Sequence, residues 1–140
     1  MRDRTARRLS TLHRILYRLT GGRVGRRLVR NDMLLLTTRG RRTGRPHTVP
    51  LLYLLDGDDP VVIASWGGRP THPEWYENLL ADPHVSVQIG AARFSARAEP
   101  LAEPARTFVF ERAVAAYPGY AGYQARTDRI IPVVRLVRSE

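Results

Sequence analysis

Residues 34–54 read LLLTTRGRRTGRPHTVPLLYL, and the first two strands can be predicted from them. An apolar run ending in threonines leads into a segment rich in glycine and arginine, and a second apolar run follows it. Glycine and proline between two such runs are strong turn signals. The pattern predicts two strands, over residues 33–38 and 48–55, joined as a β-hairpin by a basic loop.

Strand-like and helical patterns continue downstream of this hairpin. The expected strands are 61–65, 85–89, 93–98 and 131–137, and the expected helices are 74–81 and 103–116. In the second helix, the residues at the spacing of one face are Phe108, Val109, Arg112, Ala113 and Ala116. Pro118-Gly119 predicts an irregular segment after it. Six short strands with helices between them predict an α+β, mainly β fold: a small antiparallel barrel with peripheral helices.

The N-terminal residues have a different pattern. Over residues 4–20, leucine and isoleucine recur at three- and four-residue spacings beside an arc of arginines, which predicts an amphipathic helix. We therefore divide the chain into a basic helix and connector, 1–30, and a barrel domain, 31–140. The helix could pack on the barrel or lie on an anionic membrane surface, where each basic residue contributes about 1 kcal/mol.

Positive charge is concentrated in two segments. The formal net charge is +10, and all 23 basic residues are arginine. Residues 1–30 hold ten arginines and one acidic residue, and residues 31–45 hold four arginines and one acidic residue. Residues 46–140 hold nine arginines and eleven acidic residues, so this part of the chain is nearly neutral. Proteins that coat nucleic acid usually spread their charge along one face of the fold, so this distribution disfavours nucleic acid as a partner.

Several kinds of chemistry lack the residues they need. The chain has no cysteine and no lysine, and its four histidines show no metal-ligand spacing, so we expect no metal site. Neither a phosphate-binding P-loop nor a nucleophile elbow is present. An enzyme with this composition would rely on a bound cofactor for the difficult step. The N-terminus lacks a secretory pattern, and a cytoplasmic location is expected.

The basic loop is the strongest local signal for a ligand. Its glycines expose backbone N–H groups, and its guanidinium groups offer forked donors that suit phosphate or carboxylate. Each well-formed charge-assisted bond contributes about 1.5–3 kcal/mol. A solvated basic turn and a nucleic-acid contact are the alternatives.

Three blocks of sequence resemble the deazaflavin-dependent nitroreductase family. They are LLLTTRGRRTGRPHTVPLLYL, then ASWGG followed by HPEWYENLLADPHVSVQIG, then YPGYAGYQARTDRIIPVVRL, in the family's order. The resemblance implies a split β-barrel like those that bind FMN, with coenzyme F420 as the expected cofactor in place of FMN. F420 carries a deazaflavin ring, a phosphate and an acidic oligoglutamate tail.

The same resemblance implies which residues bind F420. The phosphate and tail fall to Arg41, Arg42, Thr43 and Arg45, with Pro50 and Tyr53 beside the cofactor. The turn of Ala64, Ser65, Trp66 and Gly67 would lie against the ring, with Ser65 near its reactive edge. Many relatives carry lysine where this chain has Trp66, and Arg69 could replace that cation. Trp75 would pack beside the ring; as an alternative, it anchors its helix in the core.

Three tyrosines in the last block complete the expected site. Tyr117, Tyr120 and Tyr123 are three residues apart, which by itself is equally typical of core packing. In the family that the chain resembles, such tyrosines line the acceptor pocket and could assist proton delivery. Tyr120 is our first candidate for this catalytic role, then Tyr117, then Tyr123.

The expected function is hydride transfer from reduced F420 to a small organic acceptor: a quinone, a nitroaromatic or an activated alkene. The main alternative is a non-catalytic split-barrel module that binds F420, flavin or fatty acid. A nucleic-acid-binding domain is the second alternative. A monomer and a homodimer are both compatible with the sequence, and peripheral membrane contact would suit a lipophilic quinone.

Overall fold

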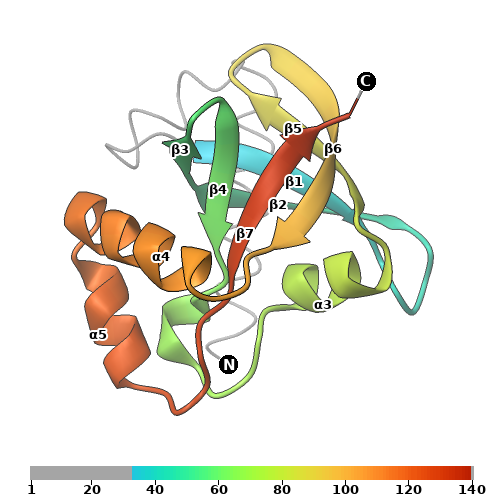
Figure 1. Cartoon of the computed structure of the whole chain (residues 1–140). Coiled ribbons are helices and arrows are strands. Elements are labelled where there is room, and N and C mark those ends of the chain that lie inside the picture. The colour runs from blue at the N-terminus through green and yellow to red at the C-terminus, as the bar shows by residue number, and fades with distance from the viewer. Residues whose placement is uncertain (1–32, 140) are drawn as a thin grey trace.

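The computed structural model describes residues 33–139 as one curled sheet with helices packed against it (Figure 1). The elements are β1 (Met33–Arg39), β2 (Pro46–Leu52), β3 (Leu54–Asp56), β4 (Asp59–Ile63), the 3-10 turn η1 (Trp66–Gly68), α3 (Glu74–Ala81), β5 (His84–Ile89), β6 (Ala92–Pro100), α4 (Ala105–Ala116), α5 (Gly119–Ala125) and β7 (Val133–Arg138). The helix expected over residues 4–20 lies outside the described residues. That helix and the division at residue 30 therefore stay predictions.

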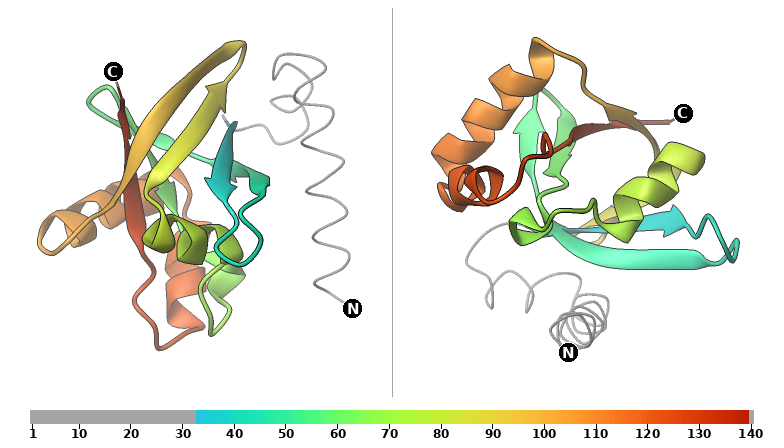
Figure 2. Two further views of the ribbon diagram at one scale, coloured as in Figure 1. Left: turned by 90° about the vertical axis from the view of Figure 1, so that its right-hand side faces the viewer. Right: turned by 90° about the horizontal axis from the view of Figure 1, so that it is seen from below.

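The sheet is antiparallel, with its strands in the order β2-β1-β5-β6-β7-β4-β3. Only Tyr53 separates β2 from β3 along the chain, yet these two strands lie at opposite ends of this order. The sheet therefore curls until its two edges approach each other, without a hydrogen-bonded ladder closing it (Figure 2). This split barrel of antiparallel strands confirms the expected fold class.

Among the described residues, two large apolar clusters and a small one, Met33 with Leu35, hold the fold together. The first fills the barrel and contains Leu34, Leu36, Val62, Ala64, Trp75, Leu79, Val85, Val87, Ala96, Ala98, Val134 and Leu136. The second lies between the β4–β7 side of the sheet and helices α4 and α5, and contains Val61, Ile63, Val109, Phe110, Ala113, Tyr120, Ile131 and Val133. Successive residues of β4 belong to different clusters, Val61 and Ile63 to the second and Val62 to the first, because successive side chains of a strand point to opposite faces.

Two expectations about strands were wrong. The single strand expected over 48–55 is two strands, because the chain changes partner at Tyr53: β2 pairs with β1, whereas β3 pairs with β4. The barrel thus has seven strands rather than six. β3 and β4 form a tight hairpin, since Asp56 pairs with Asp59 across Gly57 and Asp58, and Gly57 has a φ of 64°. Local alternation cannot reveal a change of partner, because both halves have strand character.

The helices follow the sequence more closely. Residues 74–81 are confirmed as a helix. In α4, however, Phe108 is 65% exposed and Phe110 is buried. The buried face of this helix contains Val109, Phe110 and Ala113, so the expected face, which included Phe108, was wrong in part. The segment after Pro118 is also helical rather than irregular. Pro118 ends the preceding helix, but its φ of −57° suits the start of the next one.

Candidate functional site

The loop between β1 and β2 is a compact turn closed by its own backbone. The Gly40 N–H donates to the Arg45 carbonyl at 2.8 Å, and the Gly44 N–H donates to the Gly40 carbonyl at 2.7 Å. Gly44 has a φ of 73°, which L side chains rarely adopt. A Cβ atom on Gly40 would lie 2.7 Å from the Thr43 hydroxyl oxygen. The loop's geometry therefore favours glycine at both positions, at Gly44 for its backbone angle and at Gly40 for the close approach of Thr43 and of the Arg45 carbonyl, 3.2 Å from such a Cβ.

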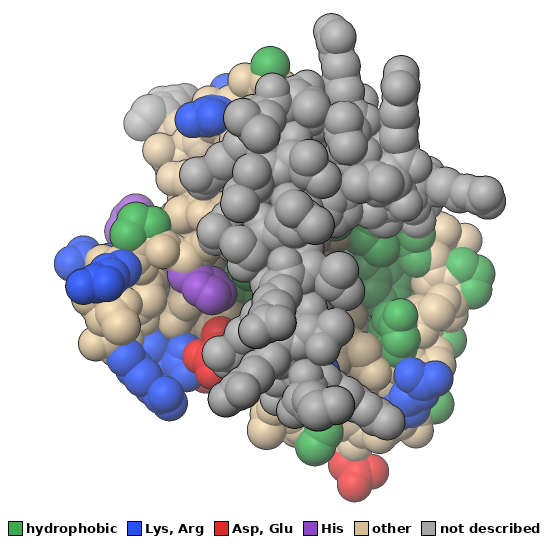
Figure 3. Space-filling view, turned by 180° about the vertical axis from the view of Figure 1, so that it is seen from behind, with side chains coloured by type: hydrophobic (Ala, Val, Ile, Leu, Met, Phe, Trp, Pro, Cys, Tyr) green, Lys and Arg blue, Asp and Glu red, His purple; other side chains and the backbone are tan. Residues whose placement is uncertain are grey.

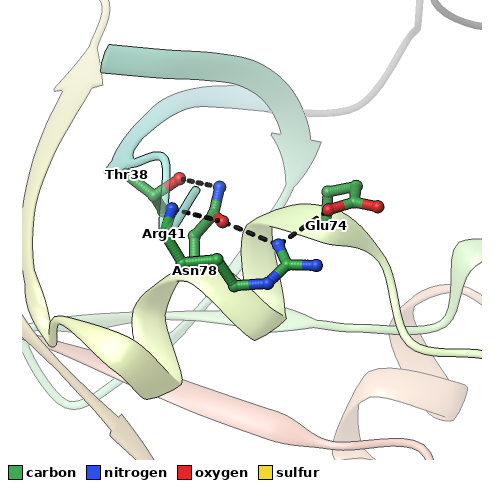
Figure 4. A network of polar contacts seen from close by, with 4 residues as sticks. All are labelled: Thr38, Arg41, Glu74 and Asn78. Carbon is green, nitrogen blue, oxygen red and sulfur yellow. Dashed lines mark hydrogen bonds and ion pairs between the residues drawn. The ribbon is translucent and has the colours of Figure 1, made fainter. Parts of the chain in front are cut away.

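Arg41 fastens this loop to helix α3 (Figure 4). Its Nη1 donates to Glu74 Oε2 at 2.7 Å and to Asn78 Oδ1 at 2.8 Å, and its backbone N–H donates to the same Asn78 oxygen at 3.2 Å. Asn78 in turn donates from Nδ2 to the Thr38 hydroxyl at 3.1 Å. Asn78 and Thr38 are 4% and 1% exposed, so this network has a fixed, buried base.

The other polar side chains of the loop face outward. Arg42, Thr43 and Arg45 are exposed, whereas Arg41 is half-buried. Seen from behind, basic side chains gather on the side of the molecule where this loop lies (Figure 3). Arg42 and Arg45 are thus presented to solvent on a loop whose position is set by Arg41 and Asn78. Asn78 had no signal in the sequence, because its role depends on a contact 40 residues away in the chain.

The turn after β4 has an unusual backbone. Trp66, Gly67 and Gly68 have φ values of 43°, 63° and 77°, so three successive residues are left-handed. A Cβ atom on Gly68 would lie 2.5 Å from the Tyr123 carbonyl oxygen, which packs the turn directly on α5. The guanidinium of Arg69 lies over the Trp66 ring, 4.5 Å from its centroid. Arg69 therefore places a cation at this turn.

Arg129, which the sequence analysis did not predict as a site residue, fixes the backbone of this turn by hydrogen bonds. It lies between α5 and β7, and its guanidinium donates to three carbonyl oxygens of the turn: Ala64 at 3.1 Å, Ser65 at 2.7 Å and Arg69 at 2.8 Å. Its Nη1 also lies 2.9 Å from His72 Nδ1. Nothing distinguishes this residue in the sequence, where it is one of many arginines.

His72 completes this group as a neutral side chain. Burial, and then the nearby charge of Arg129, lower the pKa of His72 below its ordinary value. A neutral imidazole can accept a hydrogen bond from Arg129 Nη1 at its unprotonated Nδ1, in the tautomer that carries its proton on Nε2. The His72 ring also meets the Tyr76 ring edge-on, with centroids 4.9 Å apart. The turn and the start of α3 are therefore joined through His72.

The three tyrosines lie together but in different environments. The Tyr120 ring meets the Tyr117 ring at 6.0 Å and the Tyr123 ring at 6.1 Å, both edge-on. Tyr120 is only 6% exposed, whereas the other two are half-buried. Burial, with smaller contributions from Tyr117 and Tyr123, raises the pKa of Tyr120 to about 12. Tyr120 is thus the packing centre of the group, and its neighbours are the accessible members.

The remaining expected site residues differ in burial: some belong to the core and others are partly exposed. Trp75 is 5% exposed and belongs to the barrel cluster, as its alternative role as a helix anchor requires. Ala64 and Ser65 are buried too, so backbone is the main group that they can offer a ligand. Pro50 and Tyr53 are half-buried, and the Tyr53 carbonyl accepts a long hydrogen bond of 3.5 Å from the Tyr117 hydroxyl.

The basic loop, helix α3 and the left-handed turn all lie at one end of the barrel (Figure 1). Within residues 33–139, no three His, Cys, Asp or Glu side chains are grouped so that they could hold a metal ion. Over the same residues, no helix has the length and apolar character to cross a membrane. What this end of the barrel offers is exposed guanidinium groups, left-handed backbone and aromatic side chains, which suit a flat ligand with an anionic part.

Comparison with known proteins agrees with this geometry. The model of the family described as F420H(2)-dependent quinone reductase matches residues 9–138. The chain belongs to this family. The F420H(2)-dependent quinone reductase Rv1261c of Mycobacterium tuberculosis is 42% identical over 135 residues, which cover 93% of this chain and 90% of that protein.

Solved structures support the same assignment. An F420-H2-dependent reductase, FDR-A, superimposes with a TM-score of 0.69 at 40% identity. The match covers 75% of this chain and 93% of the FDR-A chain. A structure described as a domain-swapped dimer superimposes with a TM-score of 0.71 at 36% identity. The match covers 96% of this chain and 95% of that one. The resemblance of the three sequence blocks to deazaflavin-dependent reductases is confirmed, and the quinone reductase family is the specific match.

Proposed function

We propose that this chain is an F420H2-dependent oxidoreductase that reduces a quinone. The observation that carries the proposal is the β1–β2 loop, which Arg41 fastens to α3 while Arg42 and Arg45 remain exposed. Two outward guanidinium groups on a fixed loop fit the phosphate and the acidic tail of F420. Membership of the family supports the same cofactor and acceptor.

The chain's own residues would bind and orient the two reactants. Arg42, Arg45 and the Thr43 hydroxyl would hold the anionic part, while the turn of residues 64–67 and the half-buried Tyr53 would meet the ring. Reduced F420 supplies a hydride when bound. Aromatic side chains beside the ring would align the acceptor and exclude water, which contributes to catalysis through proximity.

We infer a different order of importance for the tyrosines from the one that the sequence suggested. Tyr117 and Tyr123 are half-buried and are proposed to face the acceptor, with hydroxyl groups that stabilise charge developing on it. Tyr120, with a pKa raised to about 12 and little exposed surface, is proposed to support both rings. A phenol with that pKa remains protonated at neutral pH and is a weak proton donor.

The decisive experiment is anaerobic mixing of the full chain with reduced F420 and a panel of quinones, nitroaromatics and activated alkenes. Loss of the reduced-cofactor spectrum, dependent on both protein and acceptor and fastest with quinones, is the expected result. Tight F420 binding without turnover of any acceptor would instead indicate a binding module. Thermal stabilisation by fatty acid but not by F420 would overturn the proposal.

Peripheral membrane contact by residues 1–30 is a separate proposal that rests on the charge of this segment, ten arginines against one acid. Sedimentation with anionic vesicles, compared with zwitterionic ones, tests it. Binding should weaken strongly with added salt and require residues 1–30. Equal sedimentation with both kinds of vesicle would refute it.

A further inference from the structure

Arg129 controls the direction of two peptide groups in the turn after β4. Its Nη1 and Nη2 donate to the carbonyl oxygens of Ala64 and Ser65, at 3.1 and 2.7 Å. The peptide bonds that follow these carbonyls, 64–65 and 65–66, are trans. In a trans peptide the N–H points opposite to the C=O. The N–H groups of Ser65 and Trp66 are therefore both directed away from Arg129.

The turn needs such an external restraint. Three consecutive left-handed residues, one of them the bulky Trp66, form a conformation that persists only when its surroundings fix it. Arg129 makes a third bond, from Nε to the Arg69 carbonyl at 2.8 Å, so it holds both ends of the turn. Gly68 packs on the Tyr123 backbone and holds the middle.

The positive charge of Arg129 is not neutralised within the described residues. Its partners there are three carbonyl oxygens and the nitrogen of His72, and none of these is an anion. Burial lowers the pKa of Arg129, but a guanidinium remains charged at physiological pH. A cation bound to the carbonyl of a peptide polarises that peptide and strengthens its N–H as a donor.

We propose that Arg129 is a positioning residue that presents the N–H groups of Ser65 and Trp66 as a paired donor to an electron-rich edge of the deazaflavin ring. The inference rests on the proposed function, since it assumes that the turn meets the ring. It assigns the recognition of ring and tail to different arginines: Arg129 acts on the ring through the backbone, and Arg42 and Arg45 act on the tail directly.

The test compares two ligands and a matched control variant. Arg129→Met removes the donors, and Arg106→Met is the control, because Arg106 also caps a carbonyl, that of Ile131, with Nε and Nη2 at 3.0 and 2.7 Å. Kd is measured by fluorescence for F420 and for its precursor that lacks the phosphate and tail. Amide NMR shifts of Ser65 and Trp66 report the orientation of the two peptides without any turnover.

Arg129→Met should raise the Kd of both ligands about tenfold, the loss expected for one or two hydrogen bonds. It should also move the Ser65 and Trp66 amide signals. Arg106→Met should lower Tm and change neither Kd by more than about twofold. Arg129→Lys, which keeps the charge but cannot fork to three carbonyls, should fall between Arg129→Met and the wild type.

The outcomes separate the inference from the proposed function. Wild-type affinity of Arg129→Met for both ligands would overturn the inference alone. The inference would also be overturned if Arg129→Met and Arg106→Met lost affinity in the same proportion to their loss of Tm. That result would show that Arg129 has only a structural role. A wild-type protein that does not bind F420 would overturn both. If Arg129→Met does not fold, the same two Kd values and the Ser65 and Trp66 amide shifts are measured on Arg129→Lys. Wild-type affinity and unmoved amide signals in that variant would overturn the inference.

Discussion

At the scale of single residues, three arginines of one loop have two roles. Arg41 bonds to Glu74 and Asn78, whereas Arg42 and Arg45 extend into solvent. A guanidinium already engaged with a carboxylate has less to offer a ligand than an exposed one. The sequence treats the three as equivalent, and only their partners distinguish them.

Arg42→Ala should therefore weaken F420 binding roughly tenfold to a hundredfold, since one charge-assisted bond contributes about 1.5–3 kcal/mol. Its Tm should stay within about 1 °C of the wild type, because an exposed residue contributes little to packing. Fluorescence titration and thermal denaturation measure the two effects. Arg41→Ala is the comparison: it should lower both affinity and Tm. Unchanged affinity of Arg42→Ala would contradict the role of the loop.

The tyrosines differ in the same way, by burial rather than by chemistry. Tyr123→Phe should lower kcat several-fold more than Tyr120→Phe, because Tyr123 is half-buried whereas Tyr120 is only 6% exposed. Steady-state kinetics with saturating quinone would measure this. Neither variant should change the affinity for F420 by more than about twofold. A larger loss of kcat in Tyr120→Phe would restore the order expected from the sequence.

At the scale of elements, the turn after β4 and helix α5 form one unit. Gly68 has a φ of 77°, and a Cβ atom there would meet the Tyr123 carbonyl oxygen at 2.5 Å. The glycine is thus required twice, for its backbone angle and for the close approach of the helix. The turn proposed to meet the ring and the tyrosines proposed to meet the acceptor cannot move independently.

Gly68→Ala should consequently lower the free energy of unfolding by more than about 1 kcal/mol, the cost of the unfavourable angle alone. Gly57→Ala is the matched control, since Gly57 has a φ of 64° with nothing within 4 Å of the added Cβ. Denaturant titration compares them, and the difference between the two variants measures the clash with α5. Equal losses would show that the turn and the helix are not packed as described.

At the scale of the whole molecule, residues far apart in the chain share one site. Arg129 and His72 are 57 positions apart and lie within hydrogen-bonding distance, while Arg41 and Asn78 are 37 apart. The first pair joins the segment before β7 to the start of α3, and the second joins the β1–β2 loop to the same helix. Helix α3 is therefore the common support of both parts of the proposed site.

The Arg129–His72 pair predicts a dependence of stability on pH. The pKa of His72 is lowered on folding, so the unfolded chain takes up this proton at a higher pH than the native protein. The stabilisation is complete above the ordinary value of about 6.5 and is lost as the pH falls through the lower, native value.

In His72→Gln, whose amide oxygen can accept from Arg129 but cannot be protonated, this contribution should disappear. The Tm of the wild type should therefore fall more than that of His72→Gln between about pH 7 and pH 5. Thermal denaturation across this range measures both. Parallel curves would show that His72 does not titrate with folding.

The fold class, most element positions, the family and the basic loop could be predicted from the sequence, because these depend on local alternation, turn residues and contiguous motifs. Three features became visible only in the folded chain: the change of strand partner at Tyr53, the burial of Phe110 rather than Phe108, and the support that Asn78 and Arg129 give to the proposed site. The roles of Asn78 and Arg129 depend on contacts between residues 37 to 65 positions apart, and no local pattern records which distant carbonyl or ring a side chain will meet.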